Sequence, residues 1–263
     1  MRRNIMQKKK KTIGLNFSLN ERDLFLYYQK EGLSKHQFAT DFKSWFHRMR
    51  YKVSMNYISI YGRNAVILDV GCAEGWITKW ASQDAEFVVG LEISKAKLKR
   101  AVLESKKENN DFVLGSWDYL PFRKNVFDLV VWLEGPEHAI HPDKVIGAIH
   151  NILKFKGFLI ISTMGLLPPL HYQLMYKILC RWEKYLNHMH MWGHVSLFTR
   201  KSLLEILNTN KFSLIKEIFI GPRFITIYGI ACKLANLLHI RTNFFPLPWP
   251  GLGCVIYITL KVS

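Results

Sequence analysis

The sequence predicts an α/β fold built on a mainly parallel sheet, and three observations lead to this prediction. Five short apolar runs alternate with charged or amphipathic stretches of helical length, which is the pattern of repeated strand and helix units. A turn rich in small residues, at 71–75, follows the first run. The chain has 263 residues without a linker-like shift in composition, so we expect a single domain with right-handed crossovers between parallel strands.

The first predicted elements follow from local periodicity. Residues 20–62 favour a helix, because Trp45, Phe46 and Met49 recur at helical spacing among basic residues. The five predicted strands are Ala65–Val70, Phe87–Leu91, Phe112–Leu114, Phe127–Trp132 and Phe158–Ile161.

The last third of the chain is less regular, and Pro168-Pro169 opens it. The pattern predicts a helix at Arg200–Leu207, a strand at Phe212–Phe219, an apolar helix at Phe224–His239 and a last strand at Cys254–Val262.

Composition and net charge exclude several classes to which this protein could belong. Hydrophobic residues make up 49% of the chain, which excludes an intrinsically disordered protein. Lys and Arg total 37 against 20 Asp and Glu, and the net charge of +17 would attract nucleic acid, anionic lipid or an acidic substrate. No uninterrupted apolar stretch reaches the roughly 18 residues of a transmembrane helix, and no apolar segment typical of a secretory signal follows the basic residues 1–11.

The cysteines bear on the cellular compartment. Cys72, Cys180, Cys232 and Cys254 are too dispersed for a zinc-binding pair and too few for a disulfide framework in a chain of this size. We therefore expect reduced thiols and a cytoplasmic protein, with room for contact at the inner face of the membrane.

The strongest local signal is the turn in LDVGCAEGW at 68–76. Its small residues let backbone N–H groups approach an anionic ligand closely. Trp76 stands five residues after the first glycine, where a dinucleotide-binding turn has glycine, so a bound pyrophosphate is disfavoured. Glu92 ends the second strand about twenty residues further on, where a carboxylate can accept hydrogen bonds from both hydroxyls of a ribose. The pattern predicts a ligand that contains a ribose.

At these residues the sequence resembles the class I S-adenosylmethionine-dependent methyltransferases, in particular the group with quinone-biosynthesis and small-molecule O-methyltransferases. Five blocks stand in the family's order: LDVGCAEG at 68–75, VVGLEIS at 88–94, DFVLGSWDYLPF at 111–122, FDLVVWLEGPEH at 127–138 and ILKFKGFLIIST at 152–163. The resemblance resumes at His194–Phe219. It implies a Rossmann-like fold, a mostly parallel seven-stranded sheet with helices on both faces, an antiparallel last strand and S-adenosylmethionine as the cofactor.

The resemblance also implies roles for individual residues. Asp69 and the backbone of Gly71–Gly75 would hold the methionine end of the cofactor, and Glu92 its ribose. The segment 116–118 would border the adenine, and 133–134 would line the methionine amino group and the methyl-transfer channel. The complete implied set is Asp69, Gly71, Cys72, Ala73, Glu74, Gly75, Glu92, Ile93, Ser116, Trp117, Asp118, Leu133 and Glu134.

The sequence departs from the family pattern at three places. Ala73 stands where a glycine is usual. Ser116 replaces the common acidic partner of the adenine amino group, which leaves that contact to Ser116 or to Asp118. Phe155-Lys156 replaces the usual Pro-Gly, a change expected to affect a turn before the fifth strand rather than the cofactor.

Methyl transfer from a sulfonium needs alignment of acceptor and methyl group, and a general base is optional. For a hydroxyl acceptor a histidine is the natural base, and the candidates are His138, His141, His188, His190 and His194. We single out His138, just past the fourth strand, and His194, in a recurring family segment, although either could be a structural histidine. The histidines at 188, 190 and 194 have only Glu183 close by in sequence, so we expect no metal site.

Three parts are expected along the chain: a basic tail and helical cap over 1–62, a cofactor-binding core over 63–163 and an acceptor-side half with helical insertions over 164–263. The helical region Gln37–Tyr61 is expected to close over the cofactor, with Trp45 and Phe46 facing the site and Arg48 and Arg50 at its mouth. Simple packing of this helix on the sheet is the alternative.

The acceptor is expected to be a small, hydrophobic or lipid-like molecule. Leu166–Trp192 and Gly221–Pro250 are unusually apolar insertions that must bury their faces against the core, each other, a ligand or a membrane surface. An RNA methyltransferase and a non-catalytic cofactor-binding protein stay open as alternatives. Nucleic acid is disfavoured because Lys and Arg are spread over the chain without an RNA-binding aromatic pattern. The sequence does not indicate an oligomeric state.

Overall fold

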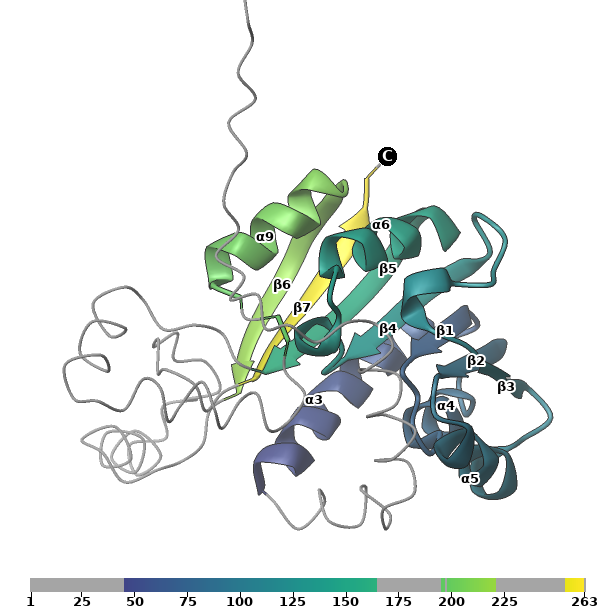
Figure 1. The fold of residues 1–263 in the computed structure, drawn as a ribbon. Helices are drawn as coiled ribbons and strands as arrows, with labels where there is room; N and C mark the ends of the chain where they lie inside the picture. The colour runs from purple at the N-terminus through teal and green to yellow at the C-terminus, as the bar shows by residue number, and fades with distance from the viewer. Residues whose placement is uncertain (1–44, 165–194, 197, 221–253, 263) are drawn as a thin grey trace, which may run out of the picture.

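A seven-stranded sheet forms the centre of the computed structural model, which describes residues 45–164, 195–196, 198–220 and 254–262 (Figure 1). The strands lie in the order β3-β2-β1-β4-β5-β7-β6. The first five are parallel to their neighbours, and β7 is antiparallel to both β5 and β6. The predicted fold, including its antiparallel last strand, is confirmed.

The elements follow the predicted order along the chain. The strands are β1 (Val66–Val70), β2 (Phe87–Glu92), β3 (Asn110–Leu114), β4 (Phe127–Leu133), β5 (Leu153–Met164), β6 (Phe212–Ile220) and β7 (Cys254–Lys261). The helices are α3 (Trp45–Gly62), α4 (Trp76–Ala81), α5 (Lys95–Ser105), α6 (Pro142–Ile152) and α9 (Arg200–Thr209), with two short 3-10 turns, η1 (Trp117–Tyr119) and η2 (Pro136–His138). The predicted helix Phe224–His239 and both apolar insertions lie outside the described residues, as do His188, His190 and His194.

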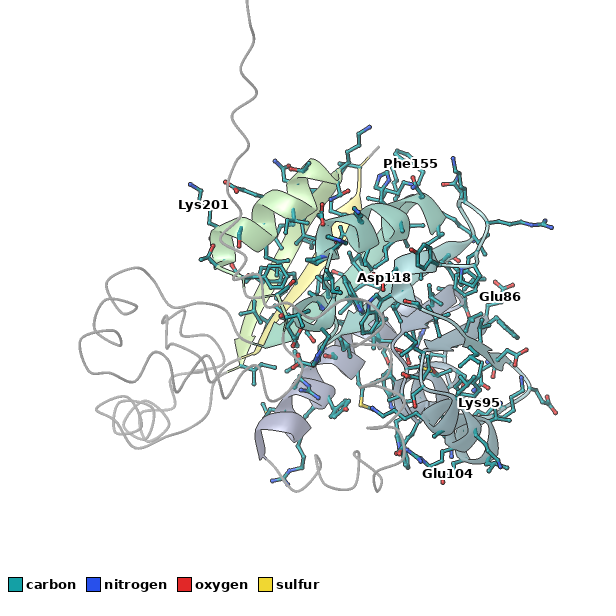
Figure 2. All side chains as sticks on the ribbon, in the orientation of Figure 1. Glu86, Lys95, Glu104, Asp118, Phe155 and Lys201 are labelled. Carbon is teal, nitrogen blue, oxygen red and sulfur yellow. The ribbon has the colours of Figure 1, made fainter. Side chains whose placement is uncertain are left out.

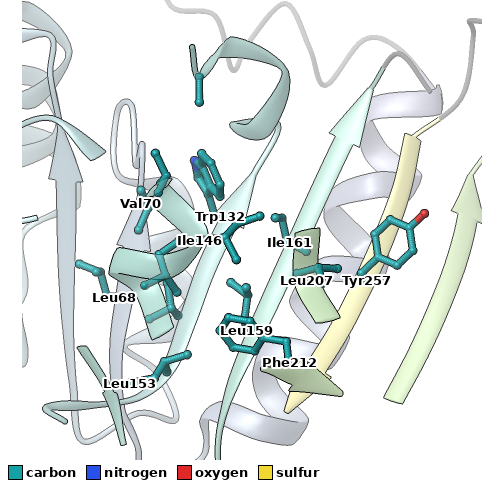
Figure 3. Packing of buried hydrophobic residues seen from close by; sticks show 14 of the residues in the cluster. Leu68, Val70, Trp132, Ile146, Leu153, Leu159, Ile161, Leu207, Phe212 and Tyr257 are labelled. Atoms are coloured by element: carbon teal, nitrogen blue, oxygen red, sulfur yellow. The ribbon is translucent and has the colours of Figure 1, made fainter. Parts of the chain in front are cut away.

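The hydrophobic core has two layers, one on each face of the sheet. Alternate residues of a strand point to opposite faces, so Ile67 of β1 packs beneath α3 and α4 whereas Leu68 packs beneath α6. Figure 3 shows the second layer, in which Trp132 of β4 and Ile161 of β5 lie among residues of α6, α9 and β7. Apolar runs that are buried on both faces explain why the central strands read as continuous hydrophobic stretches.

Helix α3 packs on the sheet, against β4, β5 and β6. Ile58 is only 1% exposed, and Gly62 allows close contact because an added Cβ would lie 2.7 Å from Ile67 Cδ1. The expectation that Arg50 lies at the mouth of the site is wrong, because Arg50 is buried and its guanidinium points inward. Helix α3 is thus packed on the sheet over 45–62, and its closure over the cofactor stays a prediction. The side chains of Trp45 and Phe46 lie outside the described part.

Strand β5 begins at Leu153, earlier than predicted. Phe127 of β4 pairs with Leu153 and Leu129 pairs with Phe158, so residues 154–157 form a bulge opposite Asp128. Phe155-Lys156 therefore lies inside β5, and the expected turn before the strand is a bulge within it. No helix among the described residues is long and apolar enough to cross a bilayer.

Candidate functional site

The glycine turn after β1 is held in a conformation that glycine adopts freely. Gly71 and Gly75 have φ of 73° and 77°, and Ala73 has φ of 48°. The N–H groups of Gly71 and Cys72 donate to the carbonyl of Leu91 at 2.8 and 3.0 Å, which ties the turn to the end of β2. A left-handed alanine costs roughly 1–2 kcal/mol relative to glycine. This strain is the physical consequence of the departure at Ala73.

Glu92 lies directly beside this turn. Its side chain is buried, with Oε2 accepting from the Ala73 N–H at 2.9 Å and Oε1 from the Ser94 N–H at 2.7 Å. Burial raises the pKa of this carboxyl, while the backbone hydrogen bond from Ser94 and the charge of Lys97 oppose the rise. Each carboxylate oxygen can accept a second hydrogen bond, so the pair of oxygens fits two ribose hydroxyls.

Asp69 is a second buried acid under the turn. Asp69 is 4% exposed, and its Oδ2 accepts a hydrogen bond from the Thr78 hydroxyl at 2.7 Å. Burial raises the pKa of Asp69 from 3.8 to about 7, with a further rise from the charge of Glu92, although the Thr78 hydrogen bond lowers it. The charge of this group therefore changes near neutral pH.

Two other residues implied by the resemblance turn their side chains away from the turn. The Glu74 carboxylate pairs with Arg100 of α5 at 2.9 Å and is 4% exposed. The Cys72 sulfur lies against Gly90 of β2, where an added Cβ would be 2.8 Å from Sγ. Burial raises the pKa of the Cys72 thiol well above its usual range, which leaves this thiol unreactive. Only the backbone of these two residues could contact a ligand.

The loop after β3 reaches the glycine turn, as the resemblance implies. An added Cβ on Gly71 would lie 3.4 Å from the Trp117 ring, whose centroid is 6.1 Å from that of Trp132. Ser116 donates to the Asp118 carboxylate at 3.0 Å and accepts from the Asp118 N–H. Figure 2 shows Asp118 near the centre of the view.

Glu134, directly after β4, is held by three elements. It has φ of 53°, and its Oε1 accepts from the Ser162 hydroxyl of β5 at 2.9 Å. Its Oε2 lies 3.1 Å from Arg50 Nη1 of α3, with the two side chains 7% and 16% exposed. Leu133, the preceding residue, packs partly into the core beneath α3. The sequence reasoning did not find the roles of Arg50 and Ser162, although a serine inside the apolar run of β5 is a signal that could have pointed to Ser162.

The two histidines singled out from the sequence belong to segments that meet. The carbonyl of Glu137, the residue before His138, accepts from the N–H groups of Val195 and Ser196 at 2.8 and 2.9 Å. His194 directly precedes Val195 but lies outside the described residues. His138 is partly buried in η2, whereas His141 is exposed at the start of α6. Among the described residues, no three His, Cys, Asp or Glu side chains are grouped as metal ligands.

The strand order, the glycine turn after β1 and the carboxylate at the end of β2 together define a class I S-adenosylmethionine-dependent methyltransferase domain. Comparison with known proteins agrees with this class. Residues 68–161 match the family model described as a methyltransferase domain. Over residues 68–161 the chain therefore has a methyltransferase domain of this class, which uses S-adenosylmethionine as its cofactor.

Curated methyltransferases are similar in sequence to the central part of this chain. The chain is 32% identical over 123 residues to a ubiquinone biosynthesis O-methyltransferase of Nitrosococcus oceani, covering 46% of this chain and 51% of the relative. It is 32% identical over 122 residues to the ubiquinone/menaquinone biosynthesis C-methyltransferase UbiE of Wigglesworthia glossinidia brevipalpis, covering 44% and 48%. The chain thus spans about half the length of the curated relatives it matches.

A solved structure extends the likeness in fold. The N-methyltransferase NodS of Bradyrhizobium japonicum, in complex with S-adenosyl-L-homocysteine, superposes with a TM-score of 0.63 at 13% identity, covering 91% of this chain and 99% of that one. At this identity the likeness shows the shared fold alone.

Proposed function

We propose that the chain transfers a methyl group from S-adenosylmethionine to a small hydrophobic or lipid-like acceptor. The observation that carries this proposal is the convergence of the glycine turn, the Glu92 carboxylate and Glu134 at the carboxyl edges of β1, β2 and β4. The relatives named for ubiquinone biosynthesis support an acceptor of this chemical class.

The residues present fit the cofactor. Glu92 would accept from the ribose hydroxyls, because each of its oxygens is fixed by one backbone N–H and has further acceptor capacity. The backbone at Gly71–Gly75 and the Asp69 carboxyl would hold the methionine end. Trp117 would border the adenine, with Ser116 or Asp118 as the partner of its amino group. Leu133 and Glu134 would line the path of the methyl group, beside the backbone of Ile93.

The chemistry that follows is a displacement. When bound, S-adenosylmethionine would supply an electrophilic methyl group on a sulfonium, whose transfer to the acceptor would form one bond to carbon and break the carbon–sulfur bond. The chain's own residues align the acceptor and exclude water. A hydroxyl acceptor also loses a proton, which His138 or His194 would accept at a ring nitrogen. The hydrogen bonds from the Val195 and Ser196 N–H groups to the Glu137 carbonyl support this choice of candidates.

The remaining parts of the chain complete the proposal. Residues 1–62 would form the tail and cap, residues 63–163 the cofactor-binding core, and residues 164–263 the acceptor-side half. The apolar segments Leu166–Trp192 and Gly221–Pro250 would enclose a hydrophobic acceptor. Their basic residues would favour contact with the inner face of the cytoplasmic membrane.

Incubation with methyl-labelled S-adenosylmethionine and fractionated cell extract tests the acceptor class. We expect label in the lipid or small-molecule fraction. Label in RNA alone would replace the proposal with an RNA methyltransferase, for which the net charge of +17 is the supporting observation. Absence of label from every fraction, with the cofactor bound, would favour a non-catalytic protein.

Calorimetric titration with S-adenosylhomocysteine and with NAD tests the cofactor residues separately. Glu92→Ala removes charge-assisted hydrogen bonds worth about 1.5–3 kcal/mol, so affinity for S-adenosylhomocysteine should fall by one to two orders of magnitude. The matched control is Glu86→Ala, an exposed glutamate that precedes the same strand (Figure 2). Tight NAD binding without a response to S-adenosylhomocysteine would contradict the assignment.

A further inference from the structure

A hollow of about 280 Å³ lies at the amino-terminal edge of the sheet, away from the cofactor site. It is lined by the end of α3 and by the beginnings of β1, β4 and β5. Because these three strands are parallel, their beginnings lie at the edge opposite the glycine turn and Glu134. Figure 2 shows this separation, with Phe155 at the top of the view and Lys95, which begins α5 after β2, far below it.

The bulge in β5 builds one wall of the hollow. Residues 154–157 are not paired with residues of β4, so their side chains do not alternate between the two faces of the sheet as they would in a regular strand. Lys156 and Phe155 are consequently exposed, Phe155 by 63%, with the Lys156 ammonium 5.6 Å from the centre of the Phe155 ring. A cation at this distance from the face of an aromatic ring is attracted by the ring, so the ring and the charge form one exposed feature.

Lys156 occupies a backbone position that suits glycine. Its φ is 59°, in the left-handed region that lysine adopts at an energetic cost. The family pattern described above has Pro-Gly here, so this chain has replaced a strain-free pair with an aromatic ring and a charge. This strain is a local cost that a glycine at the same position would not carry.

The charges around the hollow do not balance. Its single carboxylate, Asp128, accepts from the Val66 N–H and from the Lys154 ammonium, each at 2.9 Å. The remaining cations are Arg63 and Lys156, both exposed. In the part of the chain that the structure describes, no carboxylate forms an ion pair with either of them. Two cations at one small hollow attract an anion.

We propose that this hollow binds a phosphate group through Arg63 and Lys156. A guanidinium presents paired N–H donors to phosphate oxygens and an ammonium adds a point charge, which together suit a phosphate better than a carboxylate. The hollow is small for a ligand site, so it takes the phosphate and a short organic part. The phosphate belongs either to a water-soluble ester or to a phospholipid headgroup, in which case Phe155 lies at the membrane interface.

Titration of the full chain with inorganic phosphate tests the site. The double variant Arg63→Gln/Lys156→Gly removes both cations, and the glycine relieves the left-handed strain, so folding should not suffer. The control Lys99→Gln/Lys201→Gln removes two exposed charges elsewhere. We expect the site variant to lose at least tenfold in phosphate affinity and the control to stay within about twofold of the unmodified protein. No phosphate binding by the unmodified protein, or equal loss in both variants, would overturn the proposal.

Sedimentation with vesicles distinguishes the two sources of the phosphate. Vesicles of phosphatidylglycerol and of phosphatidylcholine are compared at low salt. Weaker sedimentation of the site variant than of the control variant with phosphatidylglycerol supports a lipid headgroup. Equal sedimentation of both variants, with phosphate binding still lost only in the site variant, supports a water-soluble phosphate ester.

Discussion

Replacing Asp69 with asparagine measures what the buried acid beside the glycine turn does to stability. The pKa of Asp69 rises from 3.8 to about 7 on folding, because burial disfavours its charged form. Between these two values the folded protein keeps a proton that the unfolded chain has lost. The folded state therefore binds more protons in this window, and the free energy of unfolding decreases as pH rises through it.

The size of the effect follows from the interval between the two pKa values. One pKa unit corresponds to about 1.36 kcal/mol, so the interval from 3.8 to about 7 amounts to about 4 kcal/mol. About 1.5 kcal/mol of this decrease in the free energy of unfolding has already occurred at pH 5. A further decrease of about 2–3 kcal/mol is therefore expected between pH 5 and pH 8. Asparagine has nearly the same shape and no charge, and its side-chain oxygen can accept the Thr78 hydrogen bond seen at 2.7 Å.

Urea unfolding at pH 5 and pH 8 is the assay. The advantage of Asp69→Asn over the unmodified protein should grow by about 2–3 kcal/mol from the lower to the higher pH. Asp84→Asn, which alters an exposed acid, should show no such growth. If the unmodified protein and Asp69→Asn change in parallel with pH, Asp69 is ionised throughout and the reasoning from burial is wrong.

Three further predictions follow from the packing. Arg50→Ala removes the cation beside the Glu134 carboxylate and should lower the free energy of unfolding by about 3 kcal/mol. The double variant Arg50→Ala/Glu134→Gln should lower it by less. A double-mutant cycle measured by urea unfolding gives the coupling energy, and additive decreases in the free energy of unfolding would contradict the ion pair. Lys156→Gly should raise thermal stability, by up to about 1 kcal/mol, and a lower melting temperature would show that the left-handed backbone is not strained. Gly90→Ala places a Cβ 2.8 Å from the Cys72 sulfur and from Phe112 Cδ1, and should cost about 1–3 kcal/mol. Cys72→Ala should restore part of this stability, and no restoration would contradict a clash with the sulfur.

Most of the fold could be predicted from the sequence, because the patterns that indicate its strands and helices are local in the chain. Each central strand is a short apolar run bounded by polar residues, and the right-handed crossover rule then limits how such strands can be arranged. The pairing of the glycine turn with Glu92 was also readable, since both follow consecutive strands. The structure joins them through the Ala73 N–H and Glu92 Oε2.

The contacts that sequence reasoning missed join residues far apart in the chain. Arg50 of α3 pairs with Glu134 directly after β4, whereas the sequence analysis placed this arginine at the mouth of the site. Glu74 belongs to the glycine turn, yet its side chain forms an ion pair with Arg100 of α5. The bulge at 154–157 depends on the register between β4 and β5, which periodicity within β5 does not encode.

Helix α3 sets a lower limit on the part of the chain that can fold by itself. A fragment restricted to residues 68–161, the segment that the family model matches, would lack both α3 and the strands β6 and β7. Leu129 and Ile160 would then face water instead of the helix, and β5 would become an open edge with unpaired backbone groups. Such a fragment should aggregate, and dissection of this protein has to begin before Trp45 and extend through β7.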